Sequence, residues 1–78
     1  MRAKELKLIV TFHTTTAAMA MEKACAAAGI PGRLIPVPRV ISAGCGLAWC
    51  AGIQSEDTLT ALMREHNIQP QGIYHCLV

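Results

Sequence analysis

Residues 7–29, KLIVTFHTTTAAMAMEKACAAAG, decide the fold of this chain. The first seven of them, Lys7 to His13, alternate in character with the period of two that is typical of a β-strand. The threonines at positions 14–16 offer hydroxyl groups that can cap the start of a helix. An alanine-rich helix over residues 17–28 follows, and Gly29 predicts its end. The chain therefore opens with a strand that leads directly into a helix.

The later segments complete a second, similar unit. The predicted elements are a second strand at residues 32–37, a loop at 38–46, a third strand at 47–53, a helix capped by Ser55 and a last strand at 72–78. Pro36 and Pro38 mark the end of the second strand. Because proline donates no backbone hydrogen bond, this strand is expected at an edge of the sheet. Such an exposed edge could also pair with a second copy in a homodimer.

The order β-α-β-β-α-β limits the arrangement of these elements. Strands joined through a helix run parallel and lie side by side or one strand apart. The most economical solution is a two-layer α/β sandwich of the α+β kind, with both helices on one face of a mainly antiparallel four-stranded sheet. This is the ferredoxin-like plan. We expect one domain over residues 1–78, because the chain is too short for two.

The composition excludes several classes of protein. Hydrophobic residues make up 53% of the chain, which excludes a disordered chain. A net charge of +2 and an aromatic content of 4% argue against a nucleic-acid partner. The apolar run at residues 8–12 is too short for a signal-peptide core, and no segment is long enough to span a membrane. These observations predict a cytoplasmic protein with free thiols.

The loop sequence Ser42-Ala43-Gly44-Cys45-Gly46 contains the leading candidate for chemistry. Glycines on both sides give the backbone unusual dihedral angles and allow close approach to Cys45. Successive amide groups in such a turn can bind an anion. Arg39, six residues earlier, adds a positive charge that favours a thiolate. An accessible thiolate suits persulfide chemistry or redox chemistry, whereas a cysteine that only packs under the loop needs none of these features.

The other thiols and the histidines are weaker candidates. Cys50 is interpreted as structural or auxiliary, because an odd separation from Cys45 places the two on opposite faces of an extended strand. Cys25 and Cys76 are expected to be buried and inert. No metal site is expected, since His75 and Cys76 are adjacent in a strand and point to opposite faces. His13 is expected at the solvated end of the first strand, and His66 is expected at the end of the second helix.

The segment at residues 30–49, IPGRLIPVPRVISAGCGLAW, resembles a family of small bacterial proteins described as selenium/sulfur carrier protein-like. The likeness extends to the first strand at residues 8–12 and to the last one at 72–74. The resemblance implies that Cys45 holds the transferred atom as a persulfide or perselenide. Residue 50 lies outside the pattern that carries the resemblance, which supports an auxiliary role for Cys50.

The glycine-flanked cysteine supplies an accessible nucleophile, and the resemblance implies a sulfur or selenium carrier in preference to a turnover enzyme. On this hypothesis, Cys45 receives the atom from a donor such as a cysteine desulfurase and passes it to an acceptor protein, without a cofactor. Arg39, Ser42, Gly44 and Gly46 would support the anion. One alternative is a non-catalytic regulatory or protein-interaction module, which would not need Cys45. Another is a thiol redox switch formed by Cys45 and Cys50.

Overall fold

Four strands and two α-helices make up the computed structural model, which describes residues 5–38, 41 and 46–77. In chain order the elements are β1 (Leu6–Phe12), α1 (Thr15–Ala28), β2 (Arg33–Pro36), β3 (Leu47–Gly52), a 3₁₀ turn η1 (Ile53–Ser55), α2 (Glu56–Glu65) and β4 (Pro70–Leu77). This is the β-α-β-β-α-β order predicted from the sequence.

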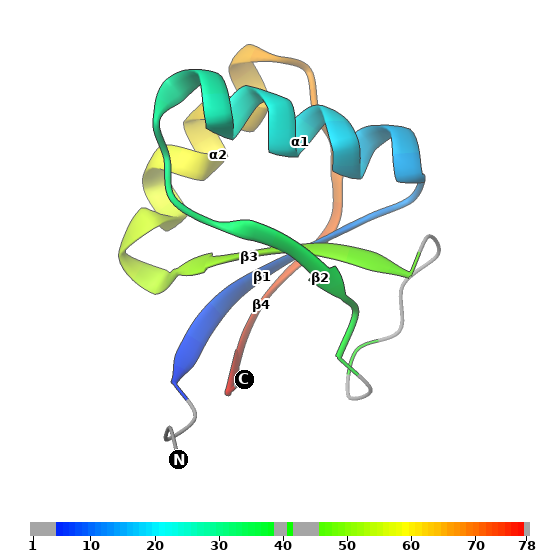
Figure 1. The fold of residues 1–78 in the computed structure, drawn as a ribbon, viewed down its shortest axis with the longest axis vertical. Coiled ribbons are helices and arrows are strands. Elements are labelled where there is room, and N and C mark those ends of the chain that lie inside the picture. Colours follow the sequence, from blue (N-terminus) through cyan, green and yellow to red (C-terminus); the bar gives the residue numbers. More distant parts are fainter. Residues whose placement is uncertain (1–4, 39–40, 42–45, 78) are drawn as a thin grey trace.

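The strands form one antiparallel sheet in the order β2-β3-β1-β4. β1 and β2 therefore run parallel on either side of β3, and β3 and β4 run parallel on either side of β1. Both helices cover the same face of the sheet (Figure 1). The fold is thus the predicted α+β ferredoxin-like arrangement, and β2 lies at an edge of the sheet as its prolines indicated.

The two ends of α1 follow the chemistry of their residues. The Thr14 hydroxyl accepts a hydrogen bond from the Ala17 N–H at 3.1 Å, so the first turn has a side-chain cap. Gly29 ends the helix in the left-handed conformation, with φ of 73°. Its backbone N–H and that of Ile30 donate to carbonyl groups of the last turn, which is the usual way a glycine terminates a helix.

Several details differ from the sequence-based expectation, among them the start of α1 at Thr15 instead of residue 17. Ser55 precedes α2, but its side chain makes no capping hydrogen bond, because the chain arrives through η1 with non-extended dihedral angles. β3 ends at Gly52, since η1 begins at the next residue. β4 begins at Pro70, two residues earlier than predicted. A proline is tolerated there because β4 is at the edge and has a neighbour on one side only.

The sheet has a large apolar cluster on its helix side and a smaller one on its open side. The helix-side cluster joins alternate residues of β1 and β3 to α1 and α2, including Leu8, Val10, Phe12, Trp49, Met21 and Leu59. The open-side cluster consists of Ile9, Ile41, Ala48 and Cys50, with Ile35, Val37 and Cys76 packed against it. The helix layer therefore covers only one of two apolar surfaces.

Gly32 permits the close approach of the Trp49 indole. Its φ is 153°, and a Cβ atom there would lie 2.7 Å from atoms of the indole ring. Any larger residue would push Trp49 out of its place in the helix-side cluster. Trp49 is only 3% exposed, and its Nε1 has no hydrogen-bond partner in the described part of the chain.

Candidate functional site

The candidate loop connects β2 to β3 and is described in part. Val37, Pro38, Ile41 and Gly46 belong to the described residues. Four of the predicted site residues, Arg39, Ser42, Gly44 and Cys45, lie outside them. The described residues form the base of the loop and its anchor on the sheet.

Two backbone hydrogen bonds define the base of this loop. The Val37 N–H donates to the Gly46 carbonyl at 3.0 Å, which brings the two ends of the loop together. The Ile41 N–H donates to the Pro38 carbonyl at 2.9 Å. Gly46 has a left-handed φ of 78°, a conformation that L-residues with a side chain rarely adopt. The peptide bond after Cys45 thus leads into a backbone position that favours glycine.

Ile41 anchors the loop on the open face of the sheet. Its side chain is 8% exposed and packs with Ile9, Ala48 and Cys50, which come from β1 and β3. The sequence did not predict this contact, because residues 38–46 were expected to form a loop and no packing partner was assigned to Ile41. The signal available in the sequence was the isoleucine itself, which stands between two proline- and glycine-rich segments. A large apolar side chain in a loop is usually buried against the rest of the domain.

The three described cysteines differ in exposure, and none of them forms a disulfide with another. Cys25 is fully buried on α1, and burial raises the pKa of its thiol. Cys50 is buried on the open side of β3, below Ile41. Cys76 is half-buried, which corrects the expectation that it is as inaccessible as Cys25. The cause is its place on β4, because an edge strand has only one neighbour to cover it.

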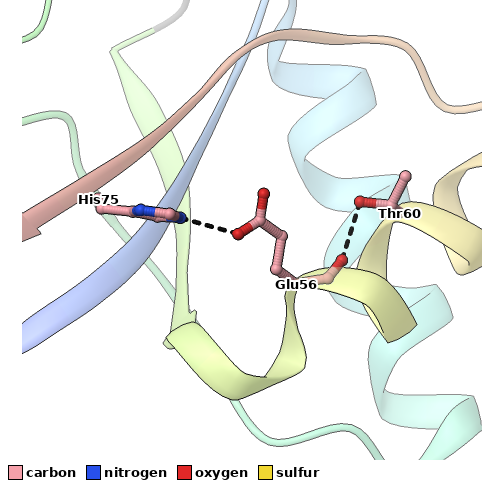
Figure 2. A network of polar contacts seen from close by, with 3 residues as sticks. All are labelled: Glu56, Thr60 and His75. Atoms are coloured by element: carbon pink, nitrogen blue, oxygen red, sulfur yellow. Dashed lines mark hydrogen bonds and ion pairs between the residues drawn. The ribbon is translucent and has the colours of Figure 1, made fainter.

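A polar contact joins β4 to the start of α2 on the helix side of the sheet. The Nε2 atom of His75 lies 2.8 Å from Oε1 of Glu56 (Figure 2). The Thr60 hydroxyl donates to the Glu56 carbonyl at 2.8 Å. His13 and His66 are exposed at the end of β1 and at the end of α2, where they were expected. Within the described ranges, no three His, Cys, Asp or Glu side chains gather as a metal site would require.

A shallow groove of about 340 Å³ lies in the helix layer. It is lined by Ala20, Lys23, Ala24, Ala27, His66 and Ile68. The candidate loop is anchored on the opposite face of the sheet through Ile41. The groove and the loop are therefore separate features of the molecule.

A family described as "Putative Se/S carrier protein-like" matches residues 7–75, which include the whole candidate loop. The chain belongs to this family. The match confirms the resemblance that the segment around Cys45 indicated. No curated protein and no solved structure matches this member of the family. The described helices are all too short or too polar to cross a membrane.

Proposed function

We propose that this chain carries a sulfur or selenium atom on Cys45 and delivers it to a partner protein. The observation that carries the proposal is the family match, because it covers residues 7–75 and so spans the cysteine-containing loop. The loop base adds support. A backbone that turns through Gly46 directly after Cys45 suits a thiol that other proteins must approach closely.

The contrast among the cysteines also supports Cys45 as the carrying residue. Cys25 and Cys50 are 0% and 8% exposed, so a protein-bound persulfide cannot reach either sulfur without local opening. The raised pKa of Cys25 further lowers its thiolate fraction at neutral pH. Cys76 is half-buried on a regular strand. Cys45 is the cysteine that occurs in a loop sequence between two glycines.

The proposed transfer is a balanced exchange without net oxidation or reduction. The Cys45 thiolate attacks the terminal sulfur of a cysteine persulfide on the donor, such as a cysteine desulfurase. A sulfur–sulfur bond to Cys45 forms while the donor's sulfur–sulfur bond breaks, and the donor cysteine leaves as a thiolate. A nucleophile on the acceptor then takes the terminal atom and regenerates the Cys45 thiolate. Arg39, Ser42 and the amides near Gly44 would stabilise the anion in both steps.

The proposal is tested by loading the protein and measuring its intact mass without reductant. After incubation with a cysteine desulfurase and cysteine, the wild-type chain should gain the mass of one sulfur atom. Cys45→Ser should abolish the gain, because a hydroxyl is a far weaker nucleophile than a thiolate at neutral pH. Cys25→Ser and Cys50→Ser are the matched controls and should keep it.

Each other outcome of this loading experiment has a definite meaning. Loss of the adduct in Cys50→Ser as well as in Cys45→Ser would indicate that the two thiols act together as a redox pair. If the wild-type chain takes up neither sulfur nor selenium from a competent donor, the carrier proposal is wrong. If the Cys45→Ser variant then still fulfils the cellular role of the protein, the chain acts as a protein-interaction module.

A further inference from the structure

β4 is the longest strand of the sheet, and it is an edge strand. It has eight residues and pairs with β1 on one side. In the described part of the chain no strand lies on its other side, since the order of the sheet is β2-β3-β1-β4. Alternate backbone N–H and C=O groups of an edge strand point away from the sheet and can accept another strand. β4 therefore presents a long line of backbone hydrogen-bonding groups.

Beyond Pro70 at its first position, the side chains of β4 do not protect this edge. Ile73, Tyr74 and Leu77 are 38%, 39% and 63% exposed, and the strand contains no Lys, Arg, Asp or Glu. Ile73 lies opposite Val10 of the helix-side cluster, whereas Tyr74 lies opposite Ile9 of the open-side cluster. Exposed apolar groups are thus present on both faces of the strand. Natural edge strands are normally short, charged or interrupted by proline.

The other edge strand, β2, shows these protective features. It has only four residues, begins with the charged Arg33 and ends with Pro36. The homodimer edge suggested by the sequence was this one, because its prolines marked it as exposed. The comparison of the two strands favours β4 as the edge that pairs.

We propose that β4 pairs antiparallel with β4 of a second copy of this chain and joins two sheets into one. A second copy fits because antiparallel pairing about a twofold axis is self-complementary. With the axis beside Tyr74, this residue lies opposite its own copy and residues 72–76 all find partners, because opposite residues of antiparallel strands must share a face of the sheet. The absence of charged residues on β4 leaves no like charges to oppose each other across the axis. The exposed Tyr74 side chains of the two copies then cover one another on the open side of the joined sheet.

The test is sedimentation equilibrium of the full chain with reductant present, so that intermolecular disulfides do not contribute. Wild type should associate reversibly to a dimer. Tyr74→Lys places ammonium groups next to the twofold axis and should raise the dimer dissociation constant at least about tenfold. Met19→Lys makes the same kind of change at a residue on α1 that is 58% exposed, and it should leave the constant unchanged.

Hydrogen exchange locates the interface without any substitution. At concentrations above the dissociation constant, amides of residues 73–77 should exchange more slowly than below it, whereas those of residues 33–35 should not change. This measurement decides the question even if Tyr74→Lys fails to fold. A chain that stays monomeric at millimolar concentration, equal effects of the two variants, or protection at residues 33–35 instead would each overturn the proposal.

Discussion

Gly46 and Gly29 have almost the same backbone conformation in different parts of the molecule. Their φ values are 78° and 73°, and apart from its chain neighbours a Cβ atom at either position would have no atom of the described residues within 4 Å. A side chain at these two positions therefore costs conformational strain and no steric clash. Gly29 ends α1, whereas Gly46 follows Cys45 at the base of the candidate loop. A substitution at Gly29 is therefore a control for one at Gly46, because it introduces the same backbone strain at a position away from the candidate thiol.

We expect Gly46→Ala and Gly29→Ala each to lower the free energy of unfolding by about 1–2 kcal/mol, since both force an L-residue into the left-handed region. Only Gly46→Ala should change the rate at which Cys45 reacts with iodoacetamide. Urea unfolding measures the first quantity, and mass spectrometry of the alkylated peptides measures the second. Equal alkylation rates in wild type and both variants would remove the Gly46 conformation from the mechanism.

At the scale of elements, the two helices begin in different ways. Thr14 has extended dihedral angles and its hydroxyl accepts from the Ala17 N–H, whereas Ser55 makes no such bond. The difference arises because α2 follows a 3₁₀ turn and α1 does not. α2 instead has Glu56 and Asp57 in its first turn, where negative charge complements the helix dipole.

Thr14→Ala should therefore lower the free energy of unfolding by about 1 kcal/mol, the usual effect of losing an N-cap. Ser55→Ala should change it by only a few tenths of that amount, although the sequence alone offers a capping hydroxyl before both helices. Chemical denaturation of the two variants measures both values. A similar loss in both would mean that the Ser55 hydroxyl stabilises the helix start after all.

These differences between elements show how far the sequence predicts the fold. The order of strands and helices, a threonine cap before the first helix and the Gly29 terminus follow from local patterns, and all were confirmed. The 3₁₀ turn and the contact between Glu56 and His75 were missed. The contact joins residues that are 19 positions apart in the chain, so no local sequence period predicts it. The same holds for the candidate site. The loop was predicted from its glycines, which are a local signal, whereas the packing of Ile41 on the sheet was not predicted.

At the scale of the whole molecule, the sheet separates two apolar clusters that are covered differently. The helix-side cluster is closed by α1 and α2, whereas Ile41 of the candidate loop helps to cover the open-side cluster. Ile41 and Ile68 are equally buried, at 8% and 9% exposure, but they belong to opposite sides. Cys50 and Cys25 report on these two sides, since each lies in one of the clusters.

Ile41→Ala and Ile68→Ala should each lower the free energy of unfolding by about 2 kcal/mol or more, because each leaves a gap in an apolar cluster. Ile41→Ala should also raise the alkylation rate of Cys50 relative to that of Cys25. Ile68→Ala should not raise this ratio, since global unfolding exposes both thiols together. Alkylation under native conditions, followed by mass spectrometry, gives the ratio. An unchanged ratio in Ile41→Ala would show that Ile41 does not shield Cys50.

Because Gly32 lets the Trp49 indole pack closely in the helix-side cluster, tryptophan fluorescence reports on the state of that cluster. Trp49 is the chain's single tryptophan, and its dry surroundings predict a blue-shifted fluorescence emission that moves to the red when the helix layer comes apart. Its indole lies on the helix side of β3, whereas the loop anchor Ile41 lies on the other side. Lifting the loop should therefore leave the emission spectrum unchanged. Fluorescence together with Cys50 labelling would distinguish a loop that opens to a partner from a domain that unfolds.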